Sequence, residues 1–413
     1  MDTETLPDPL EGVPLERLRQ RTSVKWRTHP PDVLPLWVAE MDVDLAIPVV
    51  EAICATAKSG DTGYAHGTRY AEAFAGFAAR RWGWGQLPVE RTALMPDVML
   101  GVVEVLRLVT EPGDTVIVNP PVYPPFYAFP IYAERQVREA PLGADGRLDL
   151  DVLDDAFARA RSEGRGAAYL LCNPHNPTGA VHTVDELRHV AALADRHGVR
   201  VIADEIHAPL VLSGATFVPY LSIAGETDGF SLLSASKGWN LAGLKAAVLV
   251  AGAGAATDLK RMPEVVSHGP NHVAALAHTA ALTSGDDWLD ALLAGLDRKR
   301  NLLADLLSEQ LPATSWVRPQ ASYLAWLDCR RLVAGRPGRD GPAGTTEPGN
   351  VTTIAGAARF FLERANVALS AGEAFGAGGA GHVRLNYATS ADILTQAVQA
   401  MGAAERAATA TEP

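Results

Sequence analysis

Five short apolar runs between residues 115 and 250 limit the folds open to this chain more than any other feature. They show almost no alternation of apolar and polar side chains, as expected for strands covered on both faces in a parallel sheet. The runs are 115–118, 168–171, 199–202, 230–233 and 246–250. Segments with helical spacing lie between them. The sequence therefore predicts an α/β fold with a mostly parallel central sheet flanked by helices.

One connecting helix carries signals at both ends. Thr183 and Glu186 have the Ser/Thr-x-x-Glu spacing of a capping box. Leu187 and Val190 then recur at helical spacing, and Gly198 is expected to end the helix. A strand, a helix and a further strand in this order predict a right-handed βαβ crossover.

The length of 413 residues suggests more than one domain. We expect residues 49–285 to form a large domain and 286–413 a smaller α+β domain, which 1–48 helps to complete. Pro, Arg and acidic residues are frequent in 1–35, which predicts an arm and not a packed element. Gly and Pro dominate 331–350, which favours a flexible insertion.

Charge and cysteine content exclude several classes of protein. With 36 Lys and Arg against 48 Asp and Glu, the net charge is −12, which argues against nucleic acid as a partner. Cys54, Cys172 and Cys329 are far apart and support neither a disulfide framework nor a zinc site. Residues 1–4 lack the pattern of an export signal, and the run 246–256 is too short to span a membrane. We therefore expect a cytoplasmic protein without a membrane partner.

Lys237 lies among small and hydroxyl residues directly after the run 230–233. A lysine at the end of a buried strand loses part of its preference for the ammonium form, which frees the amine as a nucleophile. Such a lysine can form a Schiff base with a carbonyl cofactor, most familiarly pyridoxal 5′-phosphate (PLP). Ser234, Ser236 and Lys245 beside it could hold a phosphate. Taken alone, a lysine in such a segment is more often a surface residue.

Polar residues also follow two other runs. Asn176 follows 168–171, and Asp204 follows 199–202. In open α/β sheets, ligands bind outside the carboxyl ends of the strands. We therefore predict one site shared by Asn176, Asp204 and Lys237.

Four segments in this order and spacing resemble the class I and II aminotransferase family of fold type I PLP enzymes. They read LCNPHNPTG at 171–179, VIADEIH at 201–207, SASKGWNLAGLK at 234–245 and VRLNY at 383–387. The resemblance covers about residues 22 to 400. It implies a PLP cofactor, an amino-acid substrate, and a large PLP-binding domain with a smaller α+β domain.

The resemblance also implies roles around the cofactor ring. Lys237 would carry PLP and then move the substrate's α-proton, while Asp204 would pair with the ring nitrogen and keep it protonated. Asn176 would donate to the 3′-oxygen, and Tyr123 would stack on the ring. From the residues alone, Asp204 could instead cap a helix, Asn176 lie in an ordinary turn and Tyr123 pack in the core. His207 stands where many members have tyrosine, so it either contacts the cofactor or is a core histidine.

The implied phosphate cradle combines the start of a helix with polar side chains of the lysine segment. Its members are Val98, Met99, Ser234, Ser236 and Lys245. Many members have arginine where Lys245 stands and glycine where Asp97 stands. Because an aspartate would repel a phosphate, we expect Asp97 to point elsewhere, either to the edge of the cofactor ring or to the solvent.

Three more residues are implied at the substrate side. Tyr64 resembles a tyrosine that one subunit contributes to its partner's phosphate, which implies a homodimer. Arg384 would clamp the substrate α-carboxylate with its guanidinium, unless it is a surface arginine on an edge strand. Ala39 lies in the segment 37–42 that closes over the substrate. We expect Lys237, Tyr123 and Tyr64 to act in catalysis.

Finer similarity concerns the reaction. The segments 34–42, 123–126, 173–177, 204–207 and 236–240 look like the cystathionine β-lyase (C–S lyase) subgroup. Its members cleave cystathionine or other cysteine S-conjugates to a thiol, pyruvate and ammonia, so we hypothesise β-elimination at a carbon–sulfur bond. The alternatives are an aminotransferase, a secondary-metabolic PLP enzyme acting on a bulky cysteine conjugate, and a scaffold that regulates other proteins.

Overall fold

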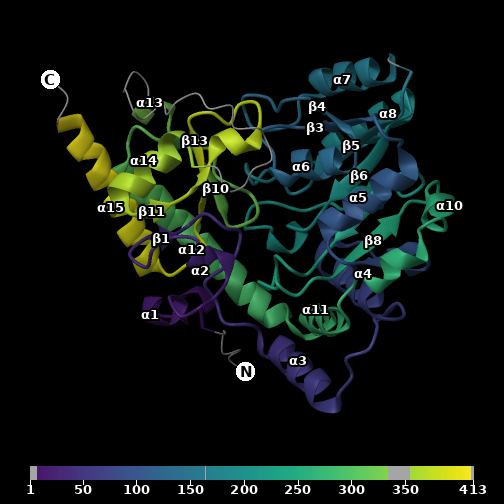
Figure 1. The fold of residues 1–413 in the computed structure, drawn as a ribbon, viewed down its shortest axis with the longest axis horizontal. Helices are drawn as coiled ribbons and strands as arrows, with labels where there is room; N and C mark the ends of the chain where they lie inside the picture. Colours follow the sequence, from purple (N-terminus) through teal and green to yellow (C-terminus); the bar gives the residue numbers. More distant parts are fainter. Residues whose placement is uncertain (1–6, 163, 334–353, 411–413) are drawn as a thin grey trace.

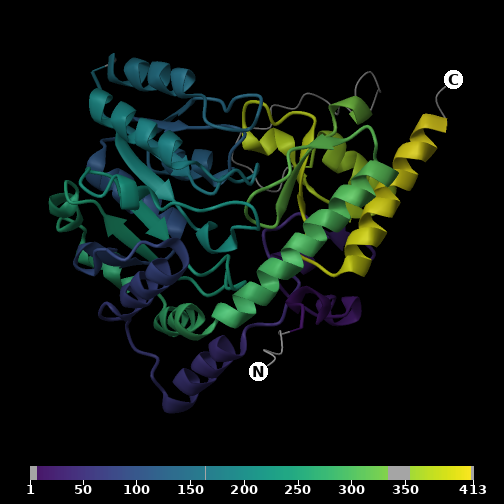
Figure 2. The same cartoon turned by 180° about the vertical axis from the view of Figure 1, so that it is seen from behind.

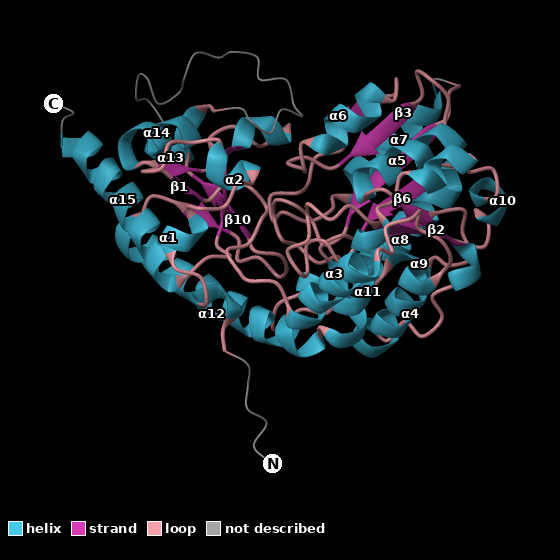
Figure 3. Ribbon diagram, turned by 60° about the horizontal axis from the view of Figure 1, so that its bottom comes forward, coloured by secondary structure: helices cyan, strands magenta, loops and turns pink. Residues whose placement is uncertain are grey.

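The described residues form two groups of helices and strands, one around a seven-stranded sheet and the other around a four-stranded sheet (Figure 1). The computed structural model describes residues 7–162, 164–333 and 354–410. The long helix α12 (Asp286–Gln310) runs from one group to the other (Figure 2). Loops fill the space between the groups (Figure 3). The domain boundaries expected from the sequence remain predictions.

The larger sheet has seven strands in the order β2-β8-β7-β6-β5-β3-β4. Within the described residues, β8 alone runs against its neighbours, so the predicted mostly parallel sheet is confirmed. The strands, in sheet order, are Thr92–Met95, Ala247–Ala251, Phe230–Leu233, Arg200–Asp204, Ala167–Cys172, Thr115–Val118 and Gln136–Glu139. The predicted runs match five of these strands to within two residues at each end.

Helices cover both faces of this sheet, which explains why its strands carry few polar residues. Ile117 and Leu171 share a buried cluster with the helices of one face, whereas Val118 and Leu170 belong to the cluster of the other. The first face is covered by α4 (Arg69–Trp82), α7 (Leu150–Ser162), α8 (Val184–His197) and α11 (His272–Ser284). The second is covered by α5 (Val98–Val109) and α6 (Pro125–Tyr132).

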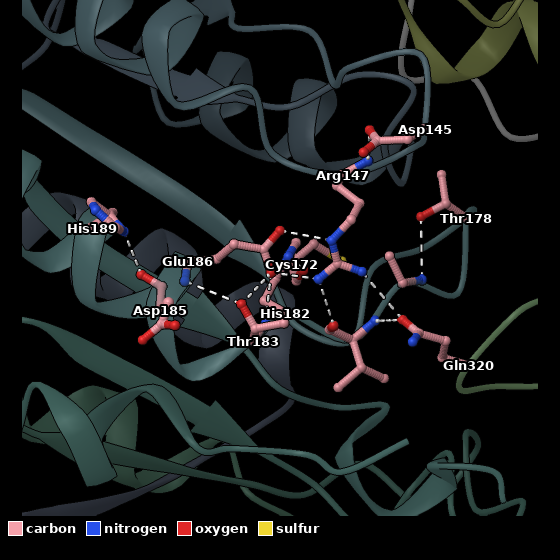
Figure 4. A network of polar contacts seen from close by, with 12 residues as sticks. Asp145, Arg147, Cys172, Thr178, His182, Thr183, Asp185, Glu186, His189 and Gln320 are labelled. Carbon is pink, nitrogen blue, oxygen red and sulfur yellow. Dashed lines mark hydrogen bonds and ion pairs between the residues drawn. The ribbon is translucent and has the colours of Figure 1, made fainter. Parts of the chain in front are cut away.

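Helix α8 has the predicted ends. The Thr183 hydroxyl accepts from the Glu186 amide at 3.2 Å, and the Glu186 carboxylate accepts from the Thr183 amide at 2.7 Å. Gly198 ends the helix at φ 62°. Arg147 donates to the same Glu186 carboxylate at 2.8 Å and to the Val181 carbonyl at 3.0 Å (Figure 4). This network holds the loop that leads from β5 through Asn176 to α8.

The smaller group contains a four-stranded antiparallel sheet in the order β12-β13-β10-β9 and a parallel pair, β1 with β11. Its strands are Ser370–Ala371, His382–Asn386, Leu324–Asp328, Ser315–Trp316, Leu34–Pro35 and Val367–Ala368. Helices α14 (Gly356–Ala365) and α15 (Ala391–Ala410) pack against each other, and α15 packs on α12.

The remaining elements are short or peripheral. They are η1 (Pro9–Glu11), α1 (Leu15–Leu18), α2 (Val24–Arg27), α3 (Ile47–Ser59), η2 (Val89–Arg91), η3 (Ala208–Leu210), α9 (Tyr220–Ile223), α10 (Ala256–Leu259), η4 (Glu264–His268), α13 (Arg330–Val333) and η5 (Gly372–Phe375). Helix α3 packs on α11.

The N-terminal segment is packed, so the prediction of an unpacked arm over 1–35 is wrong for its described part. Leu10 and Leu18 are fully buried. Lys25 is buried as well and pairs with Asp42 at 2.7 Å. Helices of three or four residues are too short to show a periodic pattern, which is why the sequence did not reveal them.

The predicted insertion at 331–350 begins inside α13, and residues 334–350 lie outside the described residues. Among the helices that are described, none is both long and apolar enough to cross a membrane.

Candidate active site

A cavity of about 160 Å³ opens at the carboxyl ends of β5, β6 and β7. Most of the residues predicted for the site line it. They are Ala39, Val98, Met99, Tyr123, Asn176, Asp204, His207, Ser234, Ser236, Lys237 and Lys245. Parallel strands end at one edge of the sheet, so residues far apart in sequence meet there.

Lys237 lies in the turn after β7, and its amine donates to the Ala39 carbonyl at 2.8 Å. Burial, together with the positive charges of Arg384 and Lys245, lowers the pKa of this amine from 10.5 to about 8. No carboxylate among the described residues forms an ion pair with it. The amine is therefore partly neutral near neutral pH, as a nucleophile or base must be.

Asp204 ends β6 and is buried in the cavity wall. One carboxyl oxygen accepts from the Ile206 amide at 3.1 Å. Burial raises the pKa of Asp204 to about 7, although the Ile206 hydrogen bond and the Lys237 charge oppose the shift. A cationic group placed against this carboxyl would favour its ionised form.

Arg384 on β13 reaches across from the smaller group and is nine-tenths buried. Its guanidinium donates to the Asn176 side-chain oxygen at 3.1 Å, to the Trp37 carbonyl at 3.0 Å and to the Ser370 hydroxyl at 3.2 Å. Its Nε has no partner, and no described carboxylate pairs with the group. A buried guanidinium without a counter-ion is a binding site for an anion such as a carboxylate. Arg384 is thus not a surface residue.

The hydrogen bond from Arg384 fixes the orientation of the Asn176 side-chain amide. Since arginine only donates hydrogen bonds, the atom facing Arg384 must be Oδ1. The amide nitrogen is left for the cavity. In the described part of the chain, no acceptor contacts it.

His207 is buried in the wall, where its Nδ1 lies 3.1 Å from the Ser322 hydroxyl. Burial lowers its pKa to about 3, and the charges of Lys237 and Arg384 act in the same direction. The ring is therefore neutral. It is held like a core histidine and also lines the cavity, and its contact with the cofactor remains a prediction.

The serines of the lysine segment differ in their contacts. The Ser234 hydroxyl donates to the Ala246 carbonyl at 2.7 Å and accepts from the Ser236 amide at 3.2 Å. Ser236 lines the cavity, and among the described residues its hydroxyl has no hydrogen-bond partner. The Ala235 amide between them donates to the Tyr70 hydroxyl at 3.1 Å. The Ser234 hydroxyl thus stabilises the turn, whereas the Ser236 hydroxyl is available to bind a ligand.

The position of Asp97 corrects our expectation that it points elsewhere. Its carboxylate accepts from the Leu100 amide at 2.8 Å, as a helix cap does, and lies 3.0 Å from the Lys245 amine. Both contacts hold it at the start of α5, beside Val98 and Met99. Asp97 therefore sits inside the expected phosphate cradle.

Tyr64 does not line the cavity of its own chain. Its side chain is 84% exposed, and its ring lies 5.8 Å from that of His268. Tyr123 does line the cavity, and burial raises the pKa of its hydroxyl to about 12.

Several site residues were missed by the sequence reasoning. Ser370 supports Arg384, the Tyr323 hydroxyl donates to the Ala39 carbonyl at 3.0 Å, and the Cys172 sulfur accepts from the Asn176 amide at 3.3 Å. Asn386 donates to the Val38 carbonyl at 2.7 Å. Only Cys172 and Asn386 carried a signal, since both lie within the quoted motifs.

The donor set suits one kind of ligand. An amine, a buried carboxyl, an amide nitrogen and an anion-attracting helix start face the same cavity. Together they could hold an aromatic aldehyde with a ring nitrogen, a phenolic oxygen and a phosphate. Arg384 would remain for a second anion.

The fold and this site define the class: the chain belongs to the class I and II aminotransferase family, whose model matches residues 32–401. The family predicted from the sequence motifs is thereby confirmed.

Individual relatives are more specific. The chain is 59% identical over 400 residues to the "Putative cystathionine beta-lyase" of Mycobacterium leprae, covering 96% of this chain and 98% of that one. It is 32% identical over 389 residues to the cystathionine beta-lyase of Corynebacterium glutamicum, covering 93% and 97%. A solved structure described as a "putative PLP-dependent beta-cystathionase" from Corynebacterium diphtheriae matches with TM-score 0.84 and 31% identity, covering 96% and 99%.

Proposed function

We propose that the protein is a PLP-dependent C–S β-lyase that cleaves L-cystathionine or another cysteine S-conjugate to a thiol, pyruvate and ammonia. The observation that carries the proposal is the meeting of Lys237, Asp204 and Asn176 at one cavity. It is found in a chain that matches cystathionine beta-lyases over nearly its whole length.

The residues present fit PLP. Lys237 would hold the aldehyde, Asp204 the ring nitrogen and Asn176 the 3′-oxygen, while Tyr123 would cover the ring. The amides at the start of α5, with Ser236 and Lys245, would hold the phosphate. When bound, PLP supplies a ring that accepts the electron pair left at the substrate Cα.

The chain's own groups then divide the work. Arg384 binds the substrate carboxylate and so orients Cα toward Lys237. The Lys237 amine removes the α-proton, and its low pKa keeps part of it neutral for this task. Tyr123 keeps its proton at neutral pH and can therefore donate a hydrogen bond but not accept a proton. A thiolate is a good leaving group, which favours cleavage of the Cβ–S bond.

Tyr64 supports a further part of the proposal, a homodimer. Its side chain is exposed and outside its own cavity. We propose that it completes the phosphate cradle of the partner subunit. The cytoplasmic location remains a prediction.

The decisive test is to incubate the purified protein with PLP and L-cystathionine and to measure free thiol and pyruvate. Both should appear in equal amounts, and Lys237→Ala should abolish them. Keto-acid-dependent amino transfer without thiol release would contradict the proposal and support an aminotransferase. Cysteine S-conjugates of increasing bulk, assayed for pyruvate, would then define the preferred substrate.

A further inference from the structure

Asp97 and Lys245 form an ion pair at the phosphate end of the cavity. Their charged atoms are 3.0 Å apart, and both residues line the cavity. The other Asp97 oxygen accepts from the Leu100 amide at 2.8 Å. The Asp97 carboxylate thus binds both groups that would attract a phosphate here, the Lys245 amine and the N-terminus of α5.

The negative charge of Asp97 acts inside the cavity. It contributes to the raised pKa of Asp204 and to that of Tyr123. A phosphate placed between Lys245 and the start of α5 would therefore meet a like charge close by. Repulsion between like charges in a partly buried site weakens the binding of the incoming anion.

The Asp97 side chain does not close the cradle. It uses the Leu100 amide, and among the described residues the amides of Val98 and Met99 have no hydrogen-bond partner. Ser236 lines the same cavity. A phosphate can thus still bind, but it must share Lys245 with Asp97 or displace it.

We propose that Asp97 is an internal competitor for the phosphate of the cofactor, which keeps this end of the site neutral when empty and weakens PLP binding. The inference rests on the proposed PLP dependence and goes beyond it. Because Asp97 weakens PLP binding, the protein needs a higher free PLP concentration to be saturated than it would without this aspartate.

Asp97→Asn is the test variant, because its amide oxygen can still cap α5 while the charge is removed. Asp97→Ser provides a second capping side chain if the first variant folds poorly. Asp149→Asn is the matched control. Asp149 accepts from the Val152 amide at 3.1 Å at the start of α7, and it does not line the cavity.

The dissociation constant of PLP is measured on the cofactor-free proteins by fluorescence quenching and visible absorbance. We expect Asp97→Asn to bind PLP about tenfold more tightly than the wild type, and Asp149→Asn to be unchanged. Pyridoxal, which lacks the phosphate, should bind wild type and Asp97→Asn equally. The inhibition constant of inorganic phosphate against PLP should be lower for Asp97→Asn than for the wild type.

Each outcome is informative. Unchanged or weaker PLP binding by both folded Asp97 variants would overturn the inference, and so would equal gains for PLP and pyridoxal. If the wild type binds no PLP, the proposed function fails together with it. If the wild type binds PLP and the variants do not gain, only the role of Asp97 is wrong.

Discussion

Arg384 donates from Nη1 to the Oδ1 of Asn176 across 3.1 Å, and this bond links the four-stranded sheet to the seven-stranded sheet. Arg384 comes from β13 of the smaller sheet, and Asn176 follows β5 of the larger one. The bond points the Asn176 amide nitrogen into the cavity. The proposed substrate clamp therefore also orients the proposed cofactor contact.

Replacing Arg384 by alanine should raise KM for L-cystathionine and lower kcat/KM by about 100-fold, since charge-assisted hydrogen bonds contribute roughly 1.5–3 kcal/mol. Steady-state pyruvate release measures both constants. Arg188→Ala, at an exposed site on α8, is the control and should change neither. An unchanged KM for Arg384→Ala would show that the carboxylate binds elsewhere.

The rate at which cofactor-free protein attaches PLP should rise with pH and level off above about pH 8. Only the neutral amine attacks the aldehyde, and burial lowers the pKa of Lys237 from 10.5 to about 8. Stopped-flow absorbance follows the reaction. A rate that still climbs steeply between pH 9 and 10 would mean that the amine has an ordinary pKa. Lys237→Ala should show no such absorbance change.

Asp204→Asn should stabilise the cofactor-free protein at pH 8. A carboxyl whose pKa rises from 3.8 to about 7 on folding contributes stability below about pH 4, and this stability is lost as pH rises through about 7. Asparagine avoids that loss, so its advantage should grow by about 3 kcal/mol between pH 5 and pH 8, because about two pKa units of the shift at 1.36 kcal/mol each are lost over this range. Urea unfolding at pH 5 and pH 8 measures the difference. A stability advantage of Asp204→Asn that did not change with pH would contradict the prediction. We also expect Asp204→Asn to bind PLP more weakly than the wild type.

Hybrid dimers test the role of Tyr64. Tyr64→Ala and Lys237→Ala should each be nearly inactive as homodimers. When differently tagged chains are unfolded and refolded together, the hybrid should have one complete site and recover about half of the wild-type activity per dimer. Chromatography on both tags isolates the hybrid. A hybrid as inactive as its parents would place Tyr64 in its own chain's site, whereas a fully active Tyr64→Ala homodimer would place it outside any site.

The buried pair of Lys25 and Asp42 should matter more than an exposed pair. Lys25→Met leaves a buried carboxylate alone and should lower the free energy of unfolding by about 3–5 kcal/mol. Arg17 pairs with Asp44 at the surface, and Arg17→Met should cost less than about 1 kcal/mol. Urea unfolding compares the two. Equal effects would mean that burial does not make the Lys25–Asp42 pair more important than the exposed Arg17–Asp44 pair.

Features encoded by neighbouring residues were predictable from the sequence. The apolar runs indicated strands buried on both faces, and Thr183 with Glu186 and Gly198 indicated the ends of α8. Lys237, Asp204 and Asn176 were placed together because strands of one parallel sheet end at the same edge. The motifs also identified the family, because their order and spacing are specific as a set.

Contacts between distant segments were decided by the tertiary structure. The bond from Arg384 to Asn176 and the support from Ser370 depend on how β13 is set against the larger sheet. The sequence alone suggested repulsion between Asp97 and a phosphate, but not that a helix start and Lys245 would hold Asp97 in the cradle. Local patterns determine which elements form, because they depend on propensity and hydrophobic spacing. Which charges and donors meet depends on how those elements pack.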